Sequence, residues 1–197
     1  MNSRPIGIFD SGIGGLTVFK EVLKELPGES IIYLGDTARV PYGTRSKEII
    51  EEFAVELAEF LLKKNVKCLV VSCNTISSTC LEAVQKVCEV PVIGVVDPAI
   101  KEAIKTTENK KIGVIGTNAT IESGIYERKI KDLDPDVEVF TQSGSLFVPL
   151  IEEGFSSHDA TRQIAKGYLS RFDGTGIDTL ILACTHFPLM TDIIAEI

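Results

Sequence analysis

Two cysteines stand at matching places in the sequence, each directly after an apolar run and directly before two polar side chains. The stretches are VVSCNT at residues 70–75, which contains Cys73, and ILACTH at residues 181–186, which contains Cys184. Each run is expected to form a β-strand, and the polar residues after it are expected to open a helix. A helix N-terminus lowers the pKa of a thiol from about 8.5 and favours the reactive thiolate. The sequence therefore predicts that both thiols take part in chemistry.

Two equivalent thiols suit a reaction that needs an acid and a base of the same kind. A hydrolase needs one nucleophile, one base and an oxyanion hole, but this chain has only two histidines, of which His158 is expected in a surface loop. Matched groups on opposite faces of a carbon atom suit inversion of its configuration, because one removes a proton and the other delivers one. Each sulfur must approach its reacting partner within about 3–3.5 Å, so the sulfurs should stand roughly 6–8 Å apart.

The other three cysteines, Cys68, Cys80 and Cys88, lie in strand or helix patterns, where a cysteine usually behaves as a small buried hydrophobic residue. The total of five is odd, and no CxxC pair occurs in the sequence. This spacing argues against a zinc site, and we expect reduced thiols in the cytoplasm.

Strand patterns alternate with helix patterns along the whole chain. The clearest helix pattern covers residues 47–64, where apolar residues recur every three or four positions, and Ser156-x-x-Asp159 resembles a capping box that opens a helix over 157–172. Such alternation predicts an α/β fold with mostly parallel sheets flanked by helices, in which ligands bind beyond the carboxyl ends of the strands. The expected strands cover residues 5–10, 30–34, 66–72, 91–96, 110–116, 136–140 and 177–183.

The sequence also contains an internal repeat. RPIGIFDS at residues 4–11 resembles KKIGVIGT at residues 110–117, with Ile112 lying 106 residues after Ile6. Cys184 follows Cys73 by a similar 111 residues. We therefore expect two similar α/β domains that face each other across one cleft and contribute one cysteine each.

The boundary between the two expected domains falls near Val96-Asp97-Pro98, which divides the chain into residues 1–96 and 97–197. Composition is that of an ordinary globular protein, with 44% hydrophobic and 24% charged residues. The net charge of −8 argues against a nucleic-acid-binding surface. No apolar run reaches the roughly 18–20 residues that a membrane span needs, and the N-terminus shows no signal-peptide pattern.

A glycine-rich turn follows the first expected strand, with the sequence Asp10-Ser11-Gly12-Ile13-Gly14-Gly15. A dinucleotide-binding loop has the sequence GxGxxG, but in this chain Thr17 stands where the third glycine is required. Asp36, however, lies near the spacing expected of an acid that binds the ribose. A nicotinamide-dependent oxidoreductase therefore stays an alternative. Asp10 would repel a pyrophosphate. The loop better suits an amino acid, with Asp10 facing the ammonium group or shuttling protons at Cys73. Helix N-termini expected at 12, 75 and 186 would supply donors for carboxylate oxygens.

Seven motifs in order resemble those of bacterial glutamate racemase, in the aspartate/glutamate racemase superfamily. They are DSGIGGLTV (10–18), YLGDTARVPYGTRS (33–46), VSCNT (71–75), VIGVVDP (92–98), IGTNAT (115–120), FVPLIEEG (147–154) and LACTHFPL (182–189). The resemblance implies a cofactor-independent isomerase, with no pyridoxal phosphate and no metal, that interconverts L- and D-glutamate for peptidoglycan and so for cell-wall biogenesis and cell shape. It implies a small-molecule substrate, glutamate, and is compatible with a homodimer.

The resemblance also assigns roles to residues. Cys73 matches the thiol that acts on the α-proton of the D-enantiomer, and Cys184 matches the thiol that acts on the L-enantiomer. Asp10, His186 and Glu152 match residues that support the acid/base chemistry, with His186 placed to favour the Cys184 thiolate. The positions that match substrate-contacting or site-lining residues are Asp10, Ser11, Tyr42, Gly43, Asn74, Thr75, Thr117, Thr120, Thr185 and His186.

Two departures from the family pattern bear on the expectations. The chain stops at Ile197, inside the helix after CTH, so a closing segment is expected to be absent and apolar surface of the first domain to be exposed. Ser143-Gly144-Ser145 stands where many relatives carry Ala-Cys-Pro, which changes a loop near the site. Two alternatives within the same resemblance are an aspartate racemase and a truncated form that binds glutamate without turnover.

Overall fold

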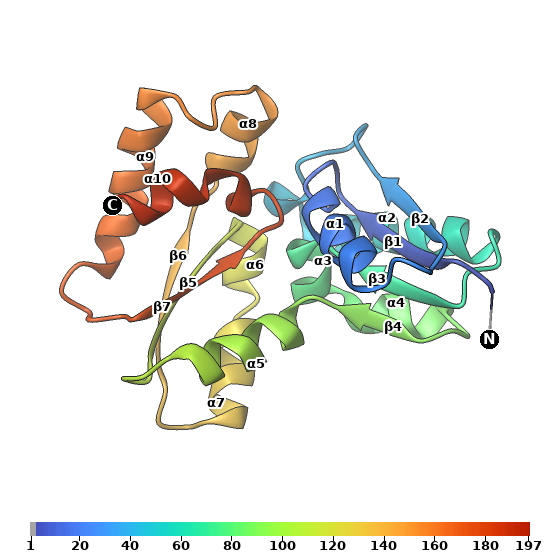
Figure 1. Cartoon of the computed structure of the whole chain (residues 1–197), viewed down its shortest axis with the longest axis horizontal. Coiled ribbons are helices and arrows are strands. Elements are labelled where there is room, and N and C mark those ends of the chain that lie inside the picture. The colour runs from blue at the N-terminus through green and yellow to red at the C-terminus, as the bar shows by residue number, and fades with distance from the viewer. Residues whose placement is uncertain (1–2) are drawn as a thin grey trace.

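The structure, a computed structural model, describes residues 3–197 and contains two separate parallel β-sheets flanked by helices (Figure 1). The first sheet has the strand order β2-β1-β3-β4, and the second has the order β6-β5-β7. This arrangement confirms the predicted fold class. The strands are β1 (Ile6–Asp10), β2 (Ile31–Gly35), β3 (Cys68–Val71), β4 (Val92–Gly94), β5 (Lys111–Gly116), β6 (Glu138–Ser143) and β7 (Thr179–Ala183).

The strand registers show that the two sheets are built alike. In the first sheet Ile6 of β1 pairs with Cys68 of β3, and in the second Ile112 of β5 pairs with Thr179 of β7. Ile112 lies 106 residues after Ile6, and Thr179 lies 111 residues after Cys68, which are the offsets of the sequence repeat. The repeated pattern therefore corresponds to a repeated pairing of strands, with the polar residues of both copies at the same edge of each sheet.

Helices connect consecutive strands, as parallel pairing requires. They are α1 (Leu16–Glu25), α2 (Lys47–Leu62), α3 (Asn74–Thr79), α4 (Leu81–Val87), α5 (Val96–Thr106), α6 (Asn118–Glu122), α7 (Ile125–Leu133), α8 (Phe147–Glu152), α9 (Asp159–Leu169) and α10 (Thr191–Ala195), with short 3-10 helices η1 (Tyr42–Thr44), η2 (Ser170–Phe172) and η3 (Phe187–Met190). None of the helices within residues 3–197 is long and apolar enough to cross a membrane. The predicted domain boundary coincides with the start of α5, and the division into residues 1–96 and 97–197 stays a prediction.

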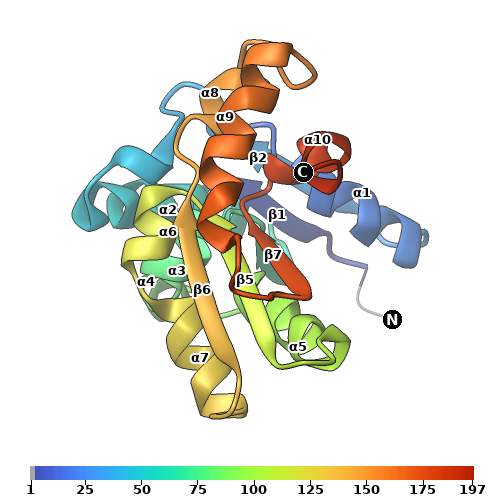
Figure 2. The same ribbon diagram turned by 90° about the vertical axis from the view of Figure 1, so that its left-hand side faces the viewer.

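Both faces of the second sheet are covered, as Figure 2 shows. Ile115 points into a core shared with α8, α9, η3 and α10, whereas Ile112 and Val114 point to the other face, where α5 and α7 pack. Apolar side chains on both faces are typical of a parallel sheet buried between helices.

The first sheet is covered unequally. Phe9, Leu69 and Val71 pack against α2, α3 and α4 in one core. On the other side, α1 has no buried residue, and its leucines Leu16 and Leu23 are 46% and 43% exposed. Apolar side chains of α1 are therefore exposed to solvent on this side of the first sheet.

Two helix starts also differ from expectation. Helix α1 begins at Leu16, four residues later than predicted, because residues 12–15 form a turn. Helix α9 is capped by His158, whose Nδ1 accepts from the Ala160 N–H at 3.1 Å, so the predicted capping box at Ser156 is wrong. An imidazole nitrogen supplies the acceptor that a hydroxyl would otherwise provide.

Candidate active site between the two sheets

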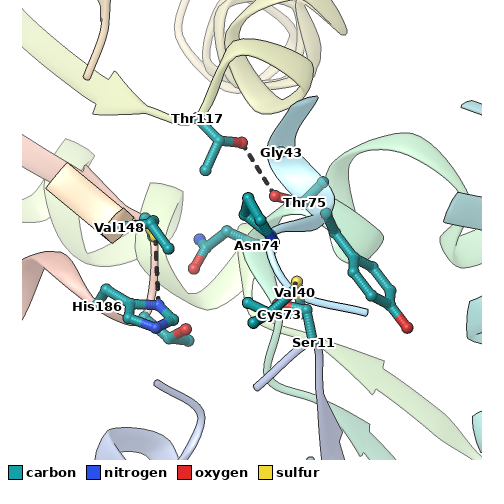
Figure 3. A pocket seen from close by; sticks show the side chains of 13 residues that line it. Ser11, Val40, Gly43, Cys73, Asn74, Thr75, Thr117, Val148 and His186 are labelled. Atoms are coloured by element: carbon teal, nitrogen blue, oxygen red, sulfur yellow. Dashed lines mark hydrogen bonds between the residues drawn. The ribbon is translucent and has the colours of Figure 1, made fainter. Parts of the chain in front are cut away.

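One small cavity lies between the carboxyl ends of the two sheets, with a volume of about 20 Å³. Both Cys73 and Cys184 line it, and Figure 3 shows Cys73 and Ser11 on one side with His186 on the other. Three predicted residues, Asp10, Thr120 and Glu152, lie behind this lining. The other predicted residues in the lining are Ser11, Tyr42, Gly43, Asn74, Thr75, Thr117, Thr185 and His186.

A second, larger hollow is lined by residues of α2, α3, α4 and α7 and contains none of the predicted site residues. The Ser143–Ser145 loop also lies outside the lining of the cysteine cavity. Ser143 is hydrogen-bonded to the Asn118 side chain and Ser145 to the Tyr168 hydroxyl. The predicted chemistry is therefore confined to one place.

Cys73 stands two residues after the end of β3, as the N-cap of α3. Its Sγ donates to the Ser11 hydroxyl at 3.5 Å, and the Ser11 hydroxyl in turn donates to Asp10 Oδ1 at 3.5 Å. Burial raises the pKa of the Cys73 thiol to about 12, and the negative charge of Asp10 adds to the rise. The expectation of a lowered pKa is wrong for this site, because desolvation outweighs the N–H groups at the helix terminus.

Cys184 stands in the equivalent place after β7. Its Sγ lies 3.9 Å from His186 Nδ1, and His186 Nε2 lies 2.5 Å from Glu152 Oε1 of α8. Burial also raises the pKa of the Cys184 thiol, despite the N–H groups of His186 and Phe187. Each sulfur thus begins a short chain of polar groups, Cys73–Ser11–Asp10 on one side and Cys184–His186–Glu152 on the other.

Asp10 ends β1 and is fully buried. Its Oδ1 accepts from the Gly12 N–H at 3.0 Å, and its Oδ2 accepts from the hydroxyls of Ser72 and Thr185 at 3.3 Å each. Burial raises the pKa of this carboxyl, and these hydrogen bonds together with nearby His186 oppose the rise without cancelling it. Asp10 therefore resists ionisation next to Cys73.

Polar side chains on both sides of the cavity bind each other across the two sheets. Thr75 and Thr117 share a hydrogen bond of 2.9 Å between their hydroxyls (Figure 3). Thr117 also caps α6 by accepting from the Thr120 N–H at 3.3 Å, and its hydroxyl donates to the Thr120 hydroxyl at 3.0 Å. Asn74 Nδ2 donates to the Tyr126 hydroxyl at 2.8 Å. These contacts hold α3, which follows Cys73, against α6 and α7.

The turn that carries Tyr42 and Gly43 closes another side of the cavity. A Cβ on Gly43 would lie 2.4 Å from Thr117 Cβ, so only glycine permits this approach. The Tyr42 hydroxyl donates to the Asp36 carboxylate, which also pairs with Arg39 Nε at 2.5 Å. Asp36, considered as a ribose ligand from its spacing, thus binds these two side chains.

A profile of the Asp/Glu/Hydantoin racemase family matches residues 6–197 of the chain. The chain belongs to this family. Its members are isomerases, so the predicted enzyme class is confirmed, as is the resemblance to glutamate racemases. The glutamate racemase of Geobacter metallireducens is 49% identical over 193 residues, which are 98% of this chain and 72% of that protein.

Solved structures of other family members have the same fold. Glutamate racemase from Francisella tularensis, solved in complex with D-glutamate, superposes with a TM-score of 0.94 at 44% identity and covers 100% of this chain and 74% of that one. The enzyme from Aquifex pyrophilus gives a TM-score of 0.85 at 50% identity, covering 98% of this chain and 75% of that one. The small-molecule substrate predicted for this racemase-family chain agrees with the former complex.

Sequence reasoning missed two residues of this racemase-family site. Ser72 precedes Cys73 and binds Asp10, and its position in the VVSCNT motif offered a signal. Tyr126 binds Asn74 from the first turn of the amphipathic helix α7, where its spacing is indistinguishable from that of a core residue. The arrangement as a whole brings two buried thiols to one cavity, each beside polar partners that can pass a proton to or from it.

Proposed function

We propose that this protein interconverts L- and D-glutamate by a two-base proton transfer between Cys73 and Cys184. One observation carries the proposal: both thiols line one cavity from equivalent positions at the ends of β3 and β7. The names of the relatives support glutamate as the substrate. Two-base inversion needs such a pair because the incoming and outgoing protons lie on opposite faces of the same carbon.

In the proposed reaction with D-glutamate, the Cys73 thiolate takes the α-proton and the Cys184 thiol delivers a proton to the opposite face. Cys73 ends as the thiol and Cys184 as the thiolate, and the L-enantiomer uses the same groups in reverse. Asp10 is placed to exchange a proton with Cys73 through Ser11, and His186 with Cys184. These exchanges restore the starting protonation between turnovers.

The raised thiol pKa values have a consequence for this mechanism. A buried thiolate is costly in the absence of a nearby positive charge, and the substrate brings an ammonium group into the cavity. We therefore infer that the reactive thiolate forms with substrate bound, which limits its oxidation in the free protein. Ser11, Asn74, Thr75, Thr117 and Thr185, together with Tyr42 and Gly43, would hold the ammonium and carboxylate groups, with Thr120 supporting Thr117 from behind.

The experiment that tests the proposal is incubation of the protein with L-glutamate in deuterium oxide. Optical rotation should fall to zero while deuterium appears at the α-carbon, because the delivered proton comes from solvent-exchanged groups. Incubation with L-aspartate under the same conditions tests substrate preference. If aspartate racemises faster than glutamate, aspartate becomes the proposed substrate. Calorimetric binding of glutamate without any loss of rotation would contradict the proposed turnover.

The remaining functional expectations are parts of the same proposal. The reaction needs no cofactor, and its product D-glutamate serves peptidoglycan synthesis and thereby cell-wall biogenesis and cell shape. We place the protein in the cytoplasm, a setting supported by its five free cysteines. The assembly proposed is a homodimer, which the mass measured by light scattering after gel filtration tests directly.

A further inference from the structure

Tyr33 of β2 binds the glycine-rich turn at two points, although it does not line the cavity. Its hydroxyl donates to the Gly12 carbonyl at 2.6 Å, and the Tyr33 hydroxyl oxygen itself accepts from the Gly15 N–H. The Tyr33 ring packs edge-on against Phe19 of α1, with ring centroids 6.0 Å apart. One side chain thus ties both ends of the turn and the following helix to the first sheet.

The turn lies so close to β2 that two glycines are required there. A Cβ on Gly35 would lie 2.4 Å from the Gly12 carbonyl oxygen, and a Cβ on Gly15 would lie 2.7 Å from the Tyr33 hydroxyl. Real Cβ atoms do not approach backbone oxygens this closely. The contact between the turn and β2 is therefore a close fit that depends on the Tyr33 hydroxyl and on the absence of side chains at these positions.

Gly12 connects this contact to the proposed chemistry. Its carbonyl accepts from Tyr33, and its N–H donates to Asp10 Oδ1 at 3.0 Å. Asp10 is linked to Cys73 through Ser11. A shift of the turn away from β2 would move the donor on which the Asp10 carboxylate depends. The turn also contacts the Cys184 side, where Gly14 lies against His186 and Thr185, but the hydrogen bond from the Gly12 N–H goes to Asp10.

We propose that Tyr33 is a positioning residue that holds the turn at residues 12–15, and through it Asp10, in register with Cys73. The inference rests on the proposed function, because it concerns the half of the reaction assigned to Cys73. Tyr33 stays a hydrogen-bond donor throughout, since burial and the neighbouring Asp10 both raise its pKa well above the ordinary value. It touches neither substrate nor reacting atoms.

Tyr33→Phe tests this role, because it removes the hydroxyl and keeps the ring. Misplacing a catalytic group by a fraction of an ångström lowers rates by roughly 10- to 100-fold, so kcat/KM of the variant should fall by this factor. The fall must be equal for both enantiomers, because L- and D-glutamate are equally stable and the equilibrium constant is therefore one. The diagnostic readout is the α-deuterium isotope effect on kcat/KM. It should rise for D-[2-²H]glutamate, whose proton Cys73 removes, and fall towards unity for L-[2-²H]glutamate.

Two further variants separate positioning from general loss of packing. Phe19→Leu removes the ring contact and keeps the Tyr33 hydroxyl, so it should lower the melting temperature without separating the two isotope effects. Gly35→Ala pushes directly on the Gly12 carbonyl, so it should reproduce the asymmetry of Tyr33→Phe. Equal isotope effects for both enantiomers in Tyr33→Phe, with an active wild-type protein, would overturn the inference alone. A wild-type protein that does not racemise glutamate would overturn the proposed function and the inference together.

Discussion

Asp10 and Thr185 meet between the two halves of the molecule, where the Thr185 hydroxyl donates to Asp10 Oδ2 at 3.3 Å across 175 positions of the sequence. Asp10 ends an inner strand of one sheet, and Thr185 directly follows Cys184, the first residue after a strand of the other. The carboxylate beside Cys73 is therefore held partly by the neighbour of Cys184. The two proposed bases are structurally coupled, so a change beside one of them can also affect the other.

The first prediction concerns the cysteine pair. Cys73→Ser and Cys184→Ser should each lower racemisation of both enantiomers by at least about 1,000-fold, because a serine hydroxyl is far less acidic than a thiol at about 8.5. The remaining thiol can still remove the proton that faces it. Cys184→Ser should therefore keep elimination activity on a D-glutamate analogue with a β-leaving group, and Cys73→Ser on the L-analogue.

A useful control for that experiment is Cys88→Ser, which changes a thiol outside the cavity. It should racemise at the wild-type rate. Near wild-type racemisation by both cavity variants would show that the thiols are not the bases.

The second prediction concerns the stability of the buried Asp10. Its pKa is raised above 3.8 in the folded protein by burial, so ionisation costs more in the folded state than in the unfolded state. The stability that this group contributes is complete below about pH 4 and is lost as the pH rises through the folded-state pKa. Asp10→Asn should therefore melt at a higher temperature than wild type at pH 7, with a smaller difference near pH 4.

The same Asp10→Asn variant should lose activity, mainly as a lower kcat with D-glutamate. His186→Asn should lower kcat mainly with L-glutamate. Glu152→Gln should have the same effect as His186→Asn but a smaller one. Thermal melts by circular dichroism at both pH values and initial rates in both directions provide the measurements. A lower melting temperature for Asp10→Asn at pH 7 would argue against the raised pKa.

The third prediction concerns Gly14, which packs directly against the second half of the site. A Cβ at this position would lie 2.5 Å from His186 Nδ1 and 2.6 Å from the Thr185 hydroxyl oxygen. Gly14→Ala should lower kcat/KM by about tenfold or more, because it displaces His186 from Cys184. Gly28→Ala is the matched control, since no atom lies within 4 Å of its Cβ position. Equal activity of the two variants would contradict the predicted clash.

The fourth prediction concerns metals and cofactors. No cluster of three or more His, Cys, Asp or Glu side chains suited to a metal ion occurs within residues 3–197. The cavity lining contains no lysine that could form a Schiff base with pyridoxal phosphate. Racemisation should therefore keep its full rate after dialysis against EDTA and after treatment with hydroxylamine. Loss of activity with EDTA and recovery with a divalent ion would contradict the two-base mechanism.

The fifth prediction concerns the exposed side of α1. Leu16, Leu23 and Leu26 are each more than 40% exposed and recur at helical spacing on one side. An apolar stripe of this kind should bind a hydrophobic dye. The double variant Leu23→Gln with Leu26→Gln should reduce dye fluorescence without lowering the racemisation rate, whereas Leu133→Gln, an isolated exposed leucine of α7, should change fluorescence little. Unchanged fluorescence in the double variant would place dye binding elsewhere.

The amino-acid sequence by itself determined the framework of this protein. The positions of all seven strands followed from short apolar runs, because a parallel strand buried on both faces needs such a run whatever surrounds it. The repeat of IG-type and cysteine-containing strands predicted two similar halves, and the equivalent pairings of Ile6 with Cys68 and of Ile112 with Thr179 agree with it. The apolar run followed by a cysteine and two polar side chains singled out Cys73 and Cys184, while their roles and the expected separation of their sulfurs stay predictions.

The tertiary structure alone decided the properties that depend on groups far apart in the sequence. The helix N-terminus beside Cys73 is a local feature and was foreseen, but the pKa of its thiol follows burial between two sheets and the charge of Asp10. The bonds from Tyr33 to Gly12 and from Tyr126 to Asn74 have no signature in residue spacing. Propensity and periodicity report on neighbours along the chain, whereas desolvation and long-range hydrogen bonds arise only when distant segments pack together.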